Sequence, residues 1–377
     1  MKVFFILDNA FPSNNPSAKR VKCYCKGLNY HGIATEILTI SHKGNPNENE
    51  GLAYKMIGKR HNGSTISKIK TLFINIKELK NYITKNAKSE DIVFLYSDGL
   101  ITGFLPFVIG RNKKYVRELC EIPYYYDNFK ARLLRWFYFS IIFKSYSGIV
   151  AISRSLAECA NFYKSRTAKV VRIPILVDFE KYAGVEVEDT ISNMIVFHSG
   201  SHTEEKDGFY GMVEAIGILK RDYAINISFY CTGNEPSTNE YKNIVWNYKL
   251  ESDIKYLGYI SDEELLEWQR KSSFFIINKY NSFQNKYCFA TKLGEYLASG
   301  KLVVSTSVGE ITNYLKDEVD CVFVQPDSPK LIAKRIAEIY NEPQKYKEIA
   351  ANGYLLADNL FNCLKATEKL VDFLKTI

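Results

Sequence analysis

Metal-binding side chains are scarce in this sequence of 377 residues. It has five histidines, none of them between His61 and His198, and its eight cysteines are scattered without a CxxC pair or a histidine at metal-ligand spacing. These absences argue against a zinc site and a disulfide framework, and they favour free, mostly buried thiols. No Asp-X-Asp pair follows an apolar run either. We therefore expect neither a bound metal nor a cofactor.

Long apolar runs are also missing. No window reaches the length that spans a bilayer, and the amino terminus, Met1 to Leu7, is a short strand-like run without a cleavage site. We therefore expect a cytoplasmic protein. The net charge of +8 is modest and favours anionic partners in general, such as nucleotide phosphates, lipid head groups or nucleic acid, without choosing among them.

What the sequence does have is a regular alternation of short apolar runs and amphipathic segments. In the first half, the runs of strand length are Val3 to Leu7, Glu36 to Ile40, Ile92 to Tyr96, Tyr115 to Leu119 and Gly148 to Ile152. Helical segments such as Ala18 to Tyr30 and Ser67 to Asn86 lie between them. Strands alternating with helices predict a parallel sheet covered on both faces, which is an α/β, Rossmann-like domain.

The alternation of apolar and amphipathic segments is interrupted between Lys169 and Val187. Ile173-Pro174 and a charged stretch there predict an interdomain linker. The alternation resumes with strands predicted at Met194 to His198, Ile225 to Cys231, Ile254 to Leu257, Ser273 to Ile277, Leu302 to Ser305 and Cys321 to Val324. The helices predicted between them are Phe209 to Lys220, Ser261 to Lys271, Thr291 to Ser299, Glu310 to Leu315 and Pro329 to Tyr340. We predict two Rossmann-like domains, residues 1–175 and 190–359, facing across a cleft, with a final helix at about 360–377 returning to the first domain.

The most informative stretch runs from Thr291 to Val304 and reads TKLGEYLASGKLVV. Before it, in the same order as in a known family, stand Lys206-Asp207-Gly208, Cys231-Thr232-Gly233 and Leu257-Gly258-Tyr259. Together these segments resemble the donor-binding pattern of the retaining GT-B glycosyltransferases, the glycosyl transferases group 1 family (glycosyltransferase family four). The resemblance covers nearly the whole chain and implies a nucleotide-sugar donor, a UDP- or GDP-sugar, bound mainly by the C-terminal domain.

A nucleoside diphosphate needs cations for its phosphates and hydrogen-bond acceptors for its ribose hydroxyls. Thr291 is placed to open the helix that carries Glu295, so that the amide dipoles of this helix face an anion. The resemblance assigns the ribose hydroxyls to Glu295 and the diphosphate to Lys206, taken as a catalytic group, and Lys292. Further donor contacts are expected at Gly200, Gly233, Tyr259, Phe289 and Ala290. The alternatives are a solvated Lys–Glu pair on a helix and glycines that only make turns.

Two departures from the family pattern concern the transferred sugar. Many relatives carry a second glutamate eight positions before the one at Glu295, where this chain has Tyr287. Relatives also often carry a histidine after a strand of the first domain, where this chain has Glu118 and Glu121. We expect these two carboxylates, as catalytic groups, to hold sugar hydroxyls or polarise the acceptor, with Arg117 pairing with them. A surface ion pair at a strand end is the alternative.

The loop Asp8 to Lys19 lacks the paired glycines of relatives and carries Asn14, Asn15 and Ser17 instead. Because asparagine is the non-glycine residue that best tolerates positive φ, we expect these residues to bring the backbone close to the acceptor. Lys19 and Arg20 then start a helix. There they either attract an anionic acceptor such as a lipid diphosphate or form a solvated helix end.

The resemblance implies transfer of the sugar to an acceptor hydroxyl with retention, without a metal and without a protein nucleophile. The main electrostatic task is then to stabilise the leaving diphosphate. By analogy with bacterial relatives, we expect a role in surface polysaccharide biosynthesis, in capsule or in lipopolysaccharide O-antigen, with a glycan or lipid-linked acceptor and no nucleic-acid partner. A nucleotide-sugar 2-epimerase of the same fold and a non-catalytic nucleotide-sugar-binding protein remain as alternatives.

Basic residues frame an apolar and aromatic centre in the segment Lys130 to Tyr146. One interpretation is an ordinary helix that packs on the sheet through Leu133, Leu134, Phe137 and Ile141. The other is peripheral contact with the anionic inner face of a membrane through the remaining aromatic residues, Trp136, Phe139 and Phe143.

Overall fold

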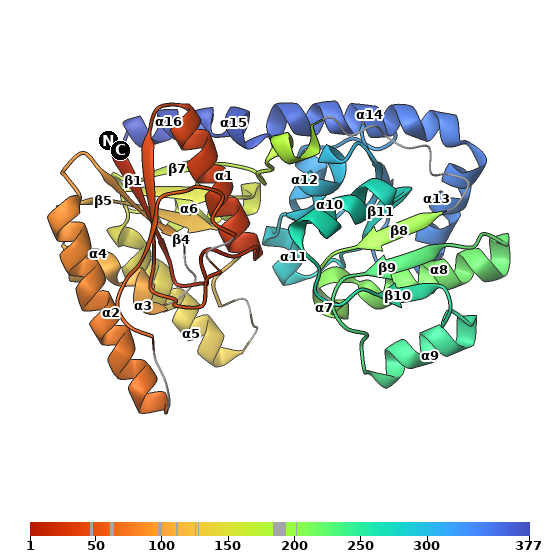
Figure 1. Ribbon diagram of the computed structural model, residues 1–377, viewed down its shortest axis with the longest axis horizontal. Coiled ribbons are helices and arrows are strands. Elements are labelled where there is room, and N and C mark those ends of the chain that lie inside the picture. Colours follow the sequence, from red (N-terminus) through yellow and green to blue (C-terminus); the bar gives the residue numbers. More distant parts are fainter. Residues whose placement is uncertain are drawn as a thin grey trace. The chain divides into compact units, whose positions relative to one another are not determined.

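The computed structural model describes residues 1–45, 48–60, 64–96, 100–110, 112–124, 126, 128–183, 194–200 and 202–377. Contacts within the chain divide it into two compact units, Met1–Leu176 with Cys363–Ile377, and Val177–Asn362. Each unit contains one parallel sheet with helices around it (Figure 1). The end of the predicted linker and the predicted start of the second domain, at residue 190, lie outside the residues that the structure describes.

The first unit is built on a seven-stranded parallel sheet in the order β3-β2-β1-β4-β5-β6-β7. Its strands are Lys2–Leu7 (β1), Ala34–Thr39 (β2), Tyr54–Met56 (β3), Ile92–Tyr96 (β4), Lys114–Leu119 (β5), Gly148–Ala151 (β6) and Lys169–Arg172 (β7). The short strands β3 and β7 were not predicted, and β7 occupies part of the predicted linker. Both lie at edges of the sheet and are only partly buried, so neither carries the apolar run that marks the central strands.

Helices of the first unit connect consecutive strands. They are Pro16–Tyr30 (α1), Thr65–Asn86 (α2), Leu100–Gly103 (α3), Leu105–Ile109 (α4), Phe129–Phe137 (α5) and Arg154–Tyr163 (α6). Asn15, Ser64, Asn128 and Ser153 precede four of these helices, and each side chain accepts a hydrogen bond from the backbone N–H three residues further on. These N-caps fix where each helix starts.

The C-terminal segment of the chain packs on the first unit. The single helix predicted at about 360–377 is two helices, Cys363–Ala366 (α15) and Glu368–Lys375 (α16). Gly27 of α1 lies so close to them that a Cβ atom there would be 2.0 Å from the Thr367 hydroxyl oxygen. Only glycine therefore permits this contact between α1 and the end of the chain.

The segment Lys130 to Tyr146, after β5, does not bury the side chains that either interpretation of its sequence expects to be buried. Helix α5 is followed by a π-helical turn, Tyr138–Ile142, and a 3₁₀ turn, Phe143–Ser145. A π turn holds more residues than an α turn, so it rotates the following side chains around the helix axis. Phe139 and Phe143, expected to face outward, are buried, whereas Ile141, expected in the buried stripe, is exposed. Leu133, also expected in that stripe, is exposed although it precedes the π turn. Trp136 is exposed as expected, at 60%.

The second unit has a six-stranded sheet in the order β10-β9-β8-β11-β12-β13. Its strands are Ile195–His198 (β8), Ser228–Cys231 (β9), Ile254–Tyr256 (β10), Phe274–Ile277 (β11), Leu302–Thr306 (β12) and Val322–Val324 (β13). Its α-helices are Glu204–Asp207 (α7), Phe209–Tyr223 (α8), Asn239–Tyr248 (α9), Asp262–Lys271 (α10), Phe283–Tyr287 (α11), Lys292–Ala298 (α12), Pro329–Asn341 (α13) and Pro343–Leu360 (α14). Of these, α7, α9, α11 and α14 were not predicted, and the predicted helix Glu310 to Leu315 is a 3₁₀ turn at Gly309–Asn313.

The strand order of each sheet changes direction at one point, between β1 and β4 in the first and between β8 and β11 in the second. Open parallel sheets bind ligands at the carboxyl ends of the strands beside such a point. The loops after β1 and β4 and those after β8 and β11 are therefore where functional side chains are expected.

Candidate functional site

Three lysines gather around one aspartate at the carboxyl edge of the second sheet. Lys206 lies in α7 after β8, Lys279 follows β11, and Lys292 is the first residue of α12. The Nζ atom of Lys292 lies 3.3 Å from Oδ1 of Asp207, and the Nζ atom of Lys279 lies 3.6 Å from the same oxygen. Lys206 is exposed, whereas Lys279 is buried. We call these four residues the lysine cluster.

Side chains that follow β11 fix the position of the turn that carries Lys206. The Lys279 ammonium donates to the Lys206 carbonyl at 2.9 Å, and the Asn278 amide donates to the Gly208 carbonyl at 2.8 Å. Gly208 has φ 56°, and a Cβ atom there would lie 2.6 Å from the Asn278 carbonyl oxygen. Glycine is therefore required at this point, and the turn can approach the end of β11 only because of it.

The electrostatics of the lysine cluster favour an anionic ligand. Burial lowers the pKa of Lys292, and the neighbouring cations Lys279 and Lys206 lower it as well, while Asp207 acts in the opposite direction. Within this cluster, three ammonium groups meet one carboxylate. A polyanion such as a diphosphate would balance this excess positive charge with charge-assisted hydrogen bonds.

Glycines with positive φ shape the loops at this edge of the sheet, and one of them lies against Lys292. Gly200, with φ 148°, lies so near Lys292 that a Cβ atom there would be 2.6 Å from the Nζ atom. Gly233 and Gly258 both have positive φ, and the Gly233 N–H donates to the Gly258 carbonyl at 2.6 Å, which joins the loops after β9 and β10. The next residue, Tyr259, is 95% exposed. Gly200, Gly233 and Tyr259 thus lie at the predicted edge of the sheet, and their contact with a donor stays a prediction.

The motif around α12 is only partly arranged as expected. Thr291 stands at the N-cap position of α12, but its side chain makes no capping hydrogen bond. Glu295 and Ala290 are partly exposed, and Lys292 forms its ion pair with Asp207. The ring of Phe289 is buried, and the expected donor contact at this residue stays a prediction. The ring centroid lies 5.2 Å from that of Tyr314 and 5.8 Å from that of Phe361.

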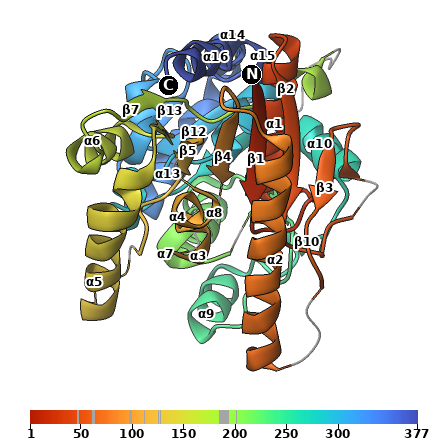
Figure 2. The same cartoon turned by 90° about the vertical axis from the view of Figure 1, so that its left-hand side faces the viewer.

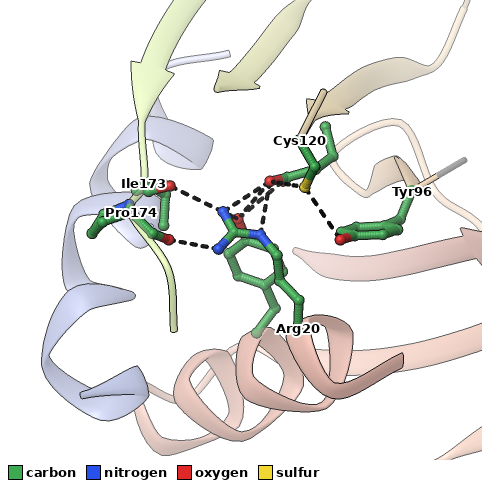
Figure 3. A network of polar contacts seen from close by, with 7 residues as sticks. Arg20, Tyr96, Cys120, Ile173 and Pro174 are labelled. Atoms are coloured by element: carbon green, nitrogen blue, oxygen red, sulfur yellow. Dashed lines mark hydrogen bonds and ion pairs between the residues drawn. The ribbon is translucent and has the colours of Figure 1, made fainter. Parts of the chain in front are cut away.

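A buried polar network occupies the carboxyl edge of the first sheet (Figure 3). The Arg20 guanidinium reaches from α1 to Glu118 at the end of β5, with Nε and Nη2 at 2.9 and 2.8 Å from Oε1. It also donates to the Ile173 carbonyl at 3.0 Å and the Pro174 carbonyl at 2.5 Å. The Tyr24 hydroxyl donates to Oε2 of Glu118 at 2.9 Å. The network therefore ties α1, β5 and the end of β7 together.

The position of Glu118 corrects the expectation that it contacts sugar hydroxyls with Arg117 as its partner. Burial raises the pKa of Glu118, and the pairing with Arg20 counteracts that rise. Arg117 lies on the other face of the strand, where its guanidinium carbon lies 5.7 Å from the centroid of the Tyr138 ring. Beyond Glu118, the network continues to the Cys120 thiol at 3.5 Å and from there to the Tyr96 hydroxyl at 3.2 Å. Glu121, which follows Cys120, is partly exposed.

The first loop is held by its own side chains rather than by positive φ. Asn15 has an extended backbone with φ −68°, so the conformation expected for it is wrong. Its side chain caps α1 and accepts from the Ser17 hydroxyl at 2.7 Å, while Asn14 accepts from the Lys22 ammonium at 3.0 Å. Lys19 is partly exposed one turn into the helix, but Arg20 belongs to the buried network.

The ion pairs of Asp207, Lys279 and Arg20 were not predicted from the sequence. A usable signal existed for Lys279, because this lysine stands in the loop after β11 just as Lys206 stands after β8. Within the part of the chain that the structure describes, no group of three His, Cys, Asp or Glu side chains is placed to hold a metal ion.

Comparisons with known proteins agree with this fold. Residues 187–356 match the family model described as Glycosyl transferases group 1. No curated protein sequence matches the chain significantly. Among solved structures, HepE from Anabaena, in complex with UDP and glucose, has a TM-score of 0.77 and 13% identity over 100% of both chains. Sucrose-phosphate synthase from Thermosynechococcus elongatus has a TM-score of 0.76 and 14% identity over 99% of this chain and 98% of its own.

The lipopolysaccharide outer core galactosyltransferase WaaB, in its apo form, has a TM-score of 0.68 and 11% identity over 100% of both chains. Identities this low show a common fold only. The chain therefore has the α/β fold of GT-B glycosyltransferases, with two parallel sheets, and its residues 187–356, which contain the whole lysine cluster, match the glycosyl transferases group 1 family.

Proposed function

We propose that the protein is a glycosyltransferase that moves a sugar from a UDP- or GDP-sugar to an acceptor hydroxyl with retention of configuration and without a metal ion. The observation that carries this proposal is the lysine cluster at the carboxyl edge of the second sheet. It supplies positive charge where a diphosphate would lie, inside the segment that matches the glycosyl transferases group 1 model. The Anabaena protein HepE has been crystallised with UDP and with UDP-glucose, which supports UDP as the nucleotide.

The residues of this site suggest how it promotes the reaction. The anomeric carbon–oxygen bond to the diphosphate breaks, and a bond from the same carbon to the acceptor oxygen forms on the same face. The acceptor proton passes to the departing phosphate oxygen. Lys206 and Lys292 stabilise the charge that develops on this leaving group, and Lys279 holds the turn that carries Lys206. Glu295 accepts hydrogen bonds from the ribose hydroxyls, and Glu121 is the remaining carboxylate for the acceptor side.

The biological role that we propose is bacterial surface polysaccharide biosynthesis, on a glycan or lipid-linked acceptor. Support comes from the similarity of the fold to that of WaaB, which is a lipopolysaccharide outer core galactosyltransferase. Capsule and O-antigen are the corresponding products in this proposal.

Calorimetry with UDP and GDP tests the donor site. The parent should bind at least one nucleotide, and Glu295→Ala and Lys206→Ala should each weaken that binding. If both variants bind as tightly as the parent, the site is misplaced. Incubation with a panel of nucleotide sugars then separates transfer from 2-epimerisation and from binding without turnover, since each gives a different product.

A further inference from the structure

The amino-terminal half of α2 and the whole of α5 carry exposed apolar side chains among basic residues. In α2, Ile69 and Phe73 lie one turn apart and are 52% and 67% exposed. In α5, Phe129, Leu133 and Trp136 follow the i, i+4, i+7 spacing of one helix face, and Phe129 is 82% exposed. Exposed apolar side chains gathered along a helix face mark an interaction surface rather than ordinary solvent-facing positions. We call the amino-terminal half of α2 together with α5 the tip surface.

Both parts of the tip surface lie at the same edge of the first unit. A helix that connects two parallel strands runs antiparallel to them, so α2 and α5 each begin at the carboxyl edge of the sheet. Figures 1 and 2 show the starting ends of both helices extending beyond the carboxyl ends of the strands, in the same direction. One flat partner can therefore contact both helices at once.

The charges on the tip surface have one sign. Residues 65–77 contain three lysines and residues 129–137 contain one lysine and two arginines, and neither segment contains an aspartate or a glutamate. Lys68, Lys70 and Lys130 are exposed beside the apolar side chains. Ile69 and Leu133 are aliphatic and suit hydrocarbon, whereas a nucleic-acid partner offers phosphates and stacked bases to basic and aromatic groups.

We propose that the tip surface docks on an anionic phospholipid bilayer. The aromatic and aliphatic side chains enter the boundary between head groups and acyl chains, and the lysines contact the lipid phosphates. No helix among the residues that the structure describes is long and apolar enough to cross a membrane. The contact is therefore an interfacial one, held by burial of apolar area together with attraction to negative charge.

Tryptophan fluorescence tests this docking directly, because the chain has three tryptophans, Trp136, Trp246 and Trp268. A variant with Trp246→Phe and Trp268→Phe retains only Trp136. With phosphatidylcholine–phosphatidylglycerol vesicles, its emission should move to shorter wavelength, and brominated lipid should quench it. A matched variant that keeps only Trp246, which is 76% exposed in the second unit, should change little. No spectral change and no quenching of Trp136 at low salt would overturn the proposal.

Flotation with the same vesicles separates the two kinds of contact. Each basic side chain near an anionic surface strengthens binding roughly fivefold, so Lys68→Gln, Lys70→Gln and Lys130→Gln together should weaken it roughly a hundredfold. Phe73→Ser with Trp136→Ser should weaken it as well. Phe162→Ser, which replaces an even more exposed ring at the far end of α6, should not weaken binding. Equal flotation of all four proteins would contradict the assigned surface.

A second copy of the chain is the competing partner for an apolar surface. Sedimentation without lipid tests this alternative, and a monomer is the expected result. Self-association would be the function of the tip surface instead if the parent is a dimer and does not float with vesicles. In that case the double variant Phe73→Ser, Trp136→Ser should be a monomer. None of these measurements needs a sugar donor, so their outcome is independent of the proposed transferase activity.

Discussion

Replacing Lys292 with methionine isolates the contribution of the buried ammonium group to nucleotide binding. Methionine keeps most of the length and apolar volume of the lysine stem, so we expect the variant to fold. Asp207 also keeps a cation partner, because Lys279 remains 3.6 Å from its carboxylate. A hydrogen bond to a charged group contributes about 1.5–3 kcal/mol, so the Kd for UDP should rise roughly ten- to hundredfold.

The pH dependence of UDP binding should change in the same variant. Burial lowers the pKa of Lys292 in the free protein, whereas a bound diphosphate would raise it again. Below the lowered pKa, Lys292 is protonated in both states and the affinity is constant. As the pH rises through the lowered pKa, the free protein loses a proton that binding must restore, so the parent should bind UDP more weakly. Lys292→Met should lack this decline.

Calorimetry with UDP and with uridine measures both effects. Uridine has no phosphates, so Lys292→Met should bind it like the parent. Lys271→Met, an exposed lysine that pairs with Glu267 on α10, is the control for loss of one positive charge and should bind UDP normally. The reasoning is refuted if Lys292→Met binds UDP like the parent, or if it loses affinity for uridine to the same extent.

Three further predictions concern the two sites. Lys279→Met should weaken UDP binding, because it releases the turn that carries Lys206. The same substitution should therefore cost little further affinity in a protein that already carries Lys206→Ala. If calorimetry shows that the two losses of binding free energy add fully, this explanation is contradicted. Arg20→Met should leave Glu118 buried without its cation and lower the free energy of unfolding by about 3–5 kcal/mol. Urea denaturation measures this loss, and an unchanged midpoint would show that the pair does not stabilise the first unit. Excess EDTA should leave sugar transfer intact, and full loss of activity that manganese restores would rule out metal independence.

Local sequence patterns were sufficient for most of the sheet framework. β4 has the bounds that its apolar run predicts, and the other central strands of the first sheet start or end within two residues of the prediction. A strand buried on both faces is apolar over most of its length, so it can be recognised without knowledge of its neighbours, although β5 also contains the buried Arg117 and Glu118. The motif from Thr291 to Val304 likewise pointed to glycosyl transferases group 1, which residues 187–356 match. The edge strand β7 was not predicted, because it is only partly buried and carries charged residues at both ends.

Contacts between distant residues were decided only by the tertiary structure. Asp207 and Lys292 are 85 residues apart, and Arg20 and Glu118 are 98 residues apart, so no periodicity links them. In the segment after β5, the π turn at Tyr138–Ile142 rotated Phe139 and Phe143 into the core and Ile141 outward. The sequence determined which side chains are charged, apolar or able to cap a helix, because these are properties of single residues and near neighbours. Which of them meet, and which are shielded from water, depends on how strands far apart in the chain are ordered in each sheet.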